Sequence, residues 1–104
     1  MTLGDIKALV VSVDPNARHY FTGYTGGSYT CWQEVEPIYF KADNRAQERG
    51  ISFEVIRITR EEEDPIAAAL ETALNATGRI SFTWRTEKLY GTEYIRHLFS
   101  CQAV

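Results

Sequence analysis

Long apolar runs and an excess of positive charge are both missing from this 104-residue sequence. No apolar stretch approaches the ~18 to 20 residues needed to span a bilayer. The opening MTLGDIKALVVSV lacks the basic start and long apolar segment of a signal peptide. The 14 acidic residues outnumber the 11 Lys and Arg, giving a net charge of -3. We therefore expect a soluble, intracellular protein with no membrane partner and no specific nucleic acid binding.

Cysteine and histidine are scarce, with two of each at Cys31, Cys101, His19 and His97. No pair has the C-x-x-C or H-x-x-x-H spacing that places two ligands together. His97 and Cys101 share a face of a predicted strand, but four extended residues separate them by ~13 Å. We therefore expect neither a metal site nor Cys–His catalysis. Both cysteines are predicted to be small buried hydrophobes that stay reduced in a cytoplasm.

Catalytic and nucleotide-binding motifs are also missing. The glycines of GYTGGS, residues 23–28, do not have the spacing of a phosphate-binding loop and no helix is predicted to follow them. The acidic run Glu61–Asp64 is the strongest hint of a metal-dependent hydrolase or nuclease, since carboxylates hold Mg²⁺. However, consecutive residues point in different directions, and acids before a helix favour its positive end. We assign no catalytic, cofactor-binding or metal-binding residue and expect no cofactor.

A 44% apolar fraction with 12% aromatic residues is typical of a globular protein, and the length fits a single domain over residues 1–104. The most informative segment is FEVIRITREEEDPIAAALETAL, residues 53–74. Phe53 and Val55 alternate with polar residues, as in a half-buried strand. Asp64 and Pro65 then form a helix start, because Asp accepts from free N–H groups and Pro fits the first position. Gly78 supplies a stop.

The other elements follow from similar patterns. Thr2 and Asp5 form a capping-box-like opening to a helix whose apolar stripe ends near Asp14. Strands are predicted over residues 17–21, 29–35, 51–59, 79–85 and 94–101, with exposed loops over Lys41 to Gly50 and Thr86 to Glu93. Pro37 bends the second strand or places it at an edge, and residues 38–40 continue its apolar pattern.

The predicted fold is therefore α+β, in the order α-β-β-β-α-β-β, with a mainly antiparallel sheet and two helices packed on one face. The sequence predicts one core, made of residues that two strand patterns and one helix stripe have to share: Phe53, Val55, Leu70, Leu74, Phe82 and Trp84. Ile56 and Ile58 add apolar residues to both strand faces. This pattern suggests that the second face of the sheet is also covered, either by neighbouring side chains or by another copy of the chain.

Five blocks carry a family resemblance: TLGDIKAL, HYF, YTCWQEVEPIYFKADN, FEVIRITREEEDPIAAALETAL and YIRHLFSC. Together they resemble the short tail-completion or tail-terminator proteins of long-tailed (siphovirus) phages and prophages of Gram-positive bacteria. The resemblance implies a structural virion protein of the head-tail or tail-terminator region, with no turnover. It implies a homo-oligomer, a ring capping the tail tube, with tail-tube or head-connector proteins as further partners. The location would be the host cytoplasm during assembly, then the virion tail or head-tail junction.

Self-association would then take place through surfaces that contain no catalytic residues. The two polar loops are long enough to reach a neighbouring subunit, and their charges can set register between copies. The candidate interface residues are Asp43, Arg45, Glu48, Arg49, Glu87 and Lys88. The alternative from another class is a bacterial α+β ligand-binding or regulatory module that uses the groove between sheet and helices.

Overall fold

The computed structural model describes residues 1–20, 27–42 and 45–104, and describes only the backbone of residues 36–42 and 45–49 within these ranges. The elements follow the predicted order α-β-β-β-α-β-β. They are α1 (Leu3–Val13), β1 (Arg18–His19), β2 (Tyr29–Ala42), β3 (Arg45–Thr59), α2 (Pro65–Ala76), β4 (Ile80–Lys88) and β5 (Ile95–Ala103).

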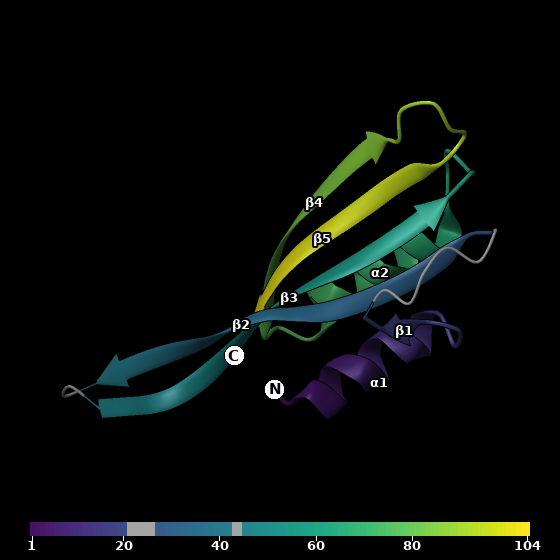
Figure 1. The fold of residues 1–104 in the computed structure, drawn as a ribbon. Coiled ribbons are helices and arrows are strands. Elements are labelled where there is room, and N and C mark those ends of the chain that lie inside the picture. Colours follow the sequence, from purple (N-terminus) through teal and green to yellow (C-terminus); the bar gives the residue numbers. More distant parts are fainter. Residues whose placement is uncertain (21–26, 43–44) are drawn as a thin grey trace.

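The strands form one five-stranded sheet in the order β1-β2-β3-β5-β4. β1 pairs with β2 in parallel, over two residues, and every other neighbouring pair is antiparallel. Both helices lie on the same face of the sheet (Figure 1). The predicted fold class, a mainly antiparallel α+β domain with two helices on one face, is confirmed.

The helix boundaries lie where the capping residues place them. Thr2 and Asp5 form a complete capping box, in which each side chain accepts from the backbone N–H of the other residue. At α2, the Asp64 carboxylate accepts from two first-turn N–H groups, and Pro65 occupies the start of the helix. Gly78 has a φ of 67°, a left-handed conformation that favours glycine and directs the chain from α2 towards β4.

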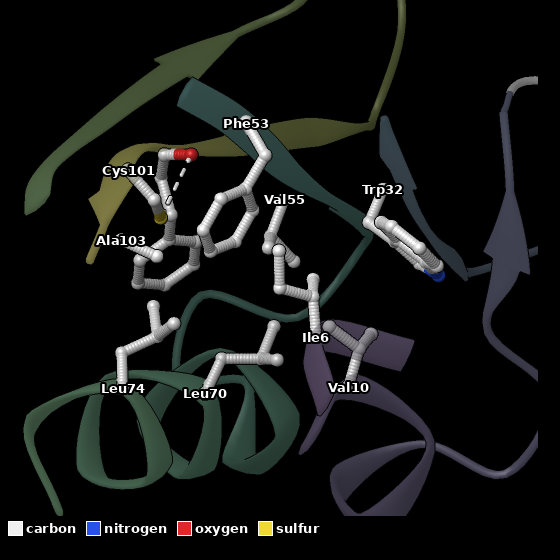
Figure 2. Close-up of a cluster of buried hydrophobic side chains, with 10 residues drawn as sticks. Ile6, Val10, Trp32, Phe53, Val55, Leu70, Leu74, Cys101 and Ala103 are labelled. Atoms are coloured by element: carbon white, nitrogen blue, oxygen red, sulfur yellow. Dashed lines mark hydrogen bonds between the residues drawn. The ribbon is translucent and has the colours of Figure 1, made fainter. Parts of the chain in front are cut away.

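The core lies between this face of the sheet and the two helices, as Figure 2 shows. Leu70 and Leu74 of α2 are fully buried, together with Ile6 and Val10 of α1. They pack against a layer of sheet side chains: Trp32, Phe53, Val55, Phe99, Cys101 and Ala103. Apolar side chains from five elements thus fill the space where the alternative hypothesis placed a ligand groove.

The predicted core is confirmed at four of its six positions, since Phe53, Val55, Leu70 and Leu74 are at most 1% exposed. Phe82 is only half-buried, and Trp84 is wrongly predicted, with 36% of its surface exposed. Both lie on β4, the outermost strand of the sheet. The alternation of apolar residues predicts which face of the sheet a side chain lies on. It does not predict that the strand is at the edge, where a side chain is covered from one side only.

The far face of the sheet is mixed in character. The register places Ile56 beside Cys31 and Leu98, on the face opposite to Val55, and Ile58 lies two residues further along the same face. Cys31 and Ile58 are 5% exposed, whereas the residues of β4 on this face are all exposed. The apolar part of the face is therefore confined to the centre of the sheet.

The predicted loop 41–50 is mostly strand and the predicted loop 86–93 begins as strand, which corrects the sequence interpretation. β2 continues to Ala42 and β3 begins at Arg45, so only residues 43–44 of the predicted loop 41–50 fall outside the two strands. The first three residues of the other predicted loop, 86–88, belong to β4. The polar composition of these segments led to the wrong prediction, because pairing between two strands satisfies the backbone hydrogen bonds whatever the side chains are.

The edge form of the Pro37 prediction is confirmed, because in the described chain β1 pairs with β2 only at Cys31 and Trp32 and β3 is the one strand beside Pro37. The break in pairing lies slightly earlier than predicted: the β2–β3 register shifts between Glu34 and Glu36, which marks a bulge, whereas Pro37 itself pairs with Ile51. Within the described residues, neither helix is long and apolar enough to cross a membrane.

Candidate functional site

A two-stranded arm is the most prominent feature of the molecule. We define the arm as residues 38–42 of β2 and 45–50 of β3, which are held by five register pairs from Ile38↔Gly50 to Ala42↔Arg45. β5 stops opposite Ile51, so no third strand accompanies the described part of the arm. Figure 1 shows these two strands projecting well beyond the rest of the sheet. The Cα positions extend over 51 × 24 × 21 Å as a result.

An arm of this kind is weakly stabilised by its own contacts. A two-stranded hairpin in water is marginally stable, and independent stability needs a third strand or a packed helix. The described residues place neither beside the arm. A projecting hairpin with two unpaired edges is therefore an element that gains most from contact with another chain.

A cluster of polar and aromatic side chains holds β1 against β2 within the body of the sheet. His19 stacks between Tyr20 and Trp32, with ring centroids 4.0 and 3.9 Å away. The His19 Nε2 lies 2.5 Å from a carboxylate oxygen of Glu34, and the Tyr20 hydroxyl donates to the other oxygen. Tyr20 has a φ of 66°, uncommon for a residue with a side chain, and its N–H donates to the Trp32 carbonyl. β1 is thereby fastened to β2 just before the bulge.

The cluster also shifts the pKa values of two of its groups. Burial raises the pKa of the Glu34 carboxyl, but the hydrogen bonds from Tyr20 and His19 lower it by more, so the net shift is downward. Donation to Glu34 raises the pKa of the Tyr20 phenol. The carboxylate and the neutral phenol therefore both persist around neutral pH, and the hydrogen bond between Tyr20 and Glu34 persists with them.

The candidate interface residues fall on two separate surfaces. Arg45, Glu48 and Arg49 lie on the β3 strand of the arm, while Asp43 lies outside the described residues. Glu87 and Lys88 lie on β4, at the opposite edge of the sheet, and both are exposed. The Glu87 carboxylate is 3.4 Å from an Arg96 nitrogen, an exposed pair that contributes little to stability. The structure does not bring the five described candidate residues together within one copy.

The acidic run before α2 has a structural role at its last residue. Asp64 is 6% exposed and its carboxylate accepts from the helix N–H groups and from the Arg57 Nε at 2.8 Å. Glu61, Glu62 and Glu63 are exposed. Among the described residues, no group of three or more His, Cys, Asp or Glu side chains is arranged to hold a metal ion.

Sequence reasoning missed a buried ionic network centred on Arg57 of β3. Its guanidinium contacts Asp64 before α2, and its Nη1 lies 3.6 Å from Asp14 after α1. The same Nη1 donates to the Thr30 hydroxyl of β2 at 3.3 Å. Alternation from Phe53 and Val55 places Arg57 on the core face, and this was the available signal. The network joins the two helices to the sheet at the end away from the arm.

His97 of β5 is buried beside this network. Its Nδ1 accepts from the Trp84 indole N–H at 3.1 Å, so the neutral ring carries its proton on Nε2. Nε2 is buried and has no hydrogen-bond partner among the described residues. Burial lowers the pKa of His97, the Asp64 charge opposes this, and the Arg57 charge adds to it. The folded protein therefore holds this imidazole neutral.

Stability should consequently fall as the pH is lowered below about 6.5, the ordinary pKa of an unfolded histidine. In that range His97 binds a proton in the unfolded chain but stays neutral in the folded one. The free energy of unfolding therefore falls by at most about 1.4 kcal/mol for each pH unit. Urea unfolding between about pH 7.5 and 5 measures this slope. His97→Gln should flatten it, and an unchanged slope in that variant would contradict the assignment.

The two cysteines are free thiols buried on opposite faces of the sheet. Burial raises the pKa of both and brings that of Cys101 to about 12. Cys101 donates to the Phe99 carbonyl at 3.5 Å, as Figure 2 shows. A thiol with so high a pKa has almost no thiolate at neutral pH and is a poor nucleophile. Both therefore serve as packing residues.

A shallow hollow of about 480 Å³ lies mainly on the sheet face away from the helices. Small hydroxyl residues dominate its lining, including Ser52, Ser81, Thr83 and Ser100. It offers few groups that could orient a small ligand, since Glu54 is the one charged side chain in its lining. The arm and the β4 edge are the stronger candidates for a functional surface.

The comparisons with known proteins support the fold. No family model matches this chain, and no curated protein matches it. A chain in the solved structure of the virion of a native gene transfer agent (GTA) particle has a similar fold, with a TM-score of 0.53. The two sequences are 13% identical over 92% of this chain and 83% of that chain. At this identity the likeness shows a shared α+β fold.

Proposed function

We propose that this protein is a structural subunit of a phage-like virion and that it works by assembly, without catalysis. The observation that carries the proposal is the arm, an unsupported two-stranded projection on an otherwise packed domain. The similar chain in the gene transfer agent belongs to a virion, and the sequence blocks resemble tail-completion proteins. These two likenesses support the same class of protein.

The finer proposal is a tail-terminator ring of a siphovirus or prophage. In such a ring each copy would contact the next head to tail, because one projecting arm per copy is an unsymmetrical feature. Tail-tube or head-connector proteins would then contact the two ends of the ring. The net charge of -3 suits a wall that passing DNA does not bind, since a basic wall would hold phosphates tightly.

Shortening the arm tests this proposal. Replacement of residues 39–49 by Asn-Gly, a favoured two-residue turn, would join the register pair Ile38↔Gly50 directly. The core and both helices lie outside the deleted segment, so the variant should stay folded. Self-association, measured by sedimentation at protein concentrations up to about 1 mM, should weaken by about tenfold or more.

The double charge reversal Arg45→Glu and Arg49→Glu is the matched variant that keeps the arm length. It should also leave the fold intact and reduce incorporation into tails or rings. A shortened protein that associates as strongly as the full-length protein would overturn the role of the arm. Normal infectious particles from the charge-reversed protein would show that these two arginines are not in the interface.

A further inference from the structure

Among the residues that the structure describes, strand β4 leaves one edge of the sheet unpaired over its whole length. In the described chain β4 pairs with β5 alone, through nine consecutive register pairs from Ile80↔Ala103 to Lys88↔Ile95 without a bulge. The strand contains neither proline nor glycine. Proteins usually protect such an edge with proline, a bulge, a cover or charged side chains, and β4 has the charged side chains alone. A long, regular edge of this kind is able to accept a further strand.

Two hydrogen bonds show which backbone groups face outward. The Val104 N–H donates to the Arg79 carbonyl at 3.1 Å, and the Leu89 N–H donates to the Tyr94 carbonyl at 3.0 Å. They bracket the β4–β5 ladder, in which bonded and outward-facing residues alternate. Odd-numbered residues of β4 therefore bond to β5. The even-numbered ones present N–H and C=O groups at the open edge: Ile80, Phe82, Trp84, Thr86 and Lys88.

We propose that this β4 edge receives the arm of a neighbouring copy, which adds to the sheet as a further strand; the inference rests on the proposed function. The arm has open outer edges on both of its strands, since the described residues of the arm pair only with each other. Its five register pairs span about 17 Å, which fits within the roughly 30 Å of the nine-residue β4 strand.

A second copy of the chain is the proposed occupant, because the arm needs a further strand beside it and the β4 edge has room for one. Each chain carries one arm and one β4 edge, so every copy gives one contact and receives one, and such heterologous contacts can close into a ring. Pairing of β4 with β4 would stop at a dimer and leave both arms unsupported. The candidate interface residues agree with the arm-to-β4 contact, since Arg45, Glu48 and Arg49 lie on the arm and Glu87 and Lys88 on β4.

Thr86→Pro tests the edge directly. The Thr86 N–H faces outward, so proline removes a donor from the open edge and keeps the ladder with β5. Thr86→Val is the matched control, because it keeps the N–H and removes the hydroxyl that lies 3.2 Å from His97 Nδ1. In sedimentation up to about 1 mM, Thr86→Pro should weaken self-association by about tenfold or more, and Thr86→Val should associate like the unmodified protein. Lys88→Pro gives the same test if Thr86→Pro fails to fold.

Mixing two variants identifies the occupant. The arm-shortened protein keeps its β4 edge, and the Thr86→Pro protein keeps its arm, so each alone should be monomeric while the mixture forms a 1:1 heterodimer. Absence of the heterodimer, or a dimer of the arm-shortened protein with itself, would overturn the arm-to-β4 contact. Association of Thr86→Pro at the level of Thr86→Val would overturn the β4 assignment and leave the arm intact. Association of the arm-shortened protein at full strength would overturn the proposed function as well.

Discussion

Replacing Arg57 with methionine is expected to lower the free energy of unfolding by about 3–5 kcal/mol, because it breaks a buried ion pair by removing one partner. Methionine keeps most of the apolar stem but removes the cation that faces Asp14 and Asp64. All three side chains are at least nine-tenths buried. Two buried carboxylates would then lose the positive charge that offsets their desolvation. Chemical denaturation at pH 7 measures the loss.

One control makes the origin of this loss specific. Adding Asp14→Asn to Arg57→Met removes one of the stranded charges and should recover part of the stability. A destabilisation below about 1 kcal/mol in the single variant would mean that the network does not hold the helices to the sheet.

Replacing Leu70 with alanine is expected to cost about 2–5 kcal/mol of unfolding free energy. Leu70 is fully buried and packs from α2 into the layer formed by Phe53, Val55 and Phe99 (Figure 2). Removing its terminal carbons leaves a cavity that α2 cannot close without losing the contacts of Leu74. The matched control is Asn75→Ala on the exposed side of α2, which should change stability by less than about 0.5 kcal/mol. An unchanged denaturation midpoint for Leu70→Ala would contradict the assigned core.

The local rules of helix formation predicted the helices well. The Thr2–Asp5 capping box, the Asp64–Pro65 start of α2 and the Gly78 stop each depend on residues within a few positions of one another. Such signals act through the backbone of one turn and need no tertiary context. For the same reason the strand alternation at Phe53 and Val55 gave the correct core face.

The parts of the candidate site that went unpredicted depend on contacts distant in the sequence. The segment KADNRAQERG has the composition of a loop, yet most of it is strand, because residues 38–42 of β2 supply pairing partners for residues 45–50 of β3. The exposure of Trp84 follows from the position of β4 at the sheet edge, which the sequence order does not reveal. The Arg57 network joins Asp14, Thr30 and Asp64 from four elements, and no local pattern links them.

Two of the features that the sequence did not predict, the arm and the exposed β4 edge, share a physical cause. In the described part of the chain, both surfaces differ from those of a self-sufficient domain: the arm has no third strand beside it, and β4 has a long unpaired edge. Local signals describe the part of the chain that folds by itself. The remaining surfaces are those that a second copy would complete.

The central claim is that the protein is a structural virion subunit, and the most direct test is quantitative mass spectrometry of purified particles from a strain that carries its gene. The account predicts several copies of the protein per particle, retained through density-gradient purification and lost when the arm is shortened. A protein that is abundant in the lysate but absent from the particles would contradict the account.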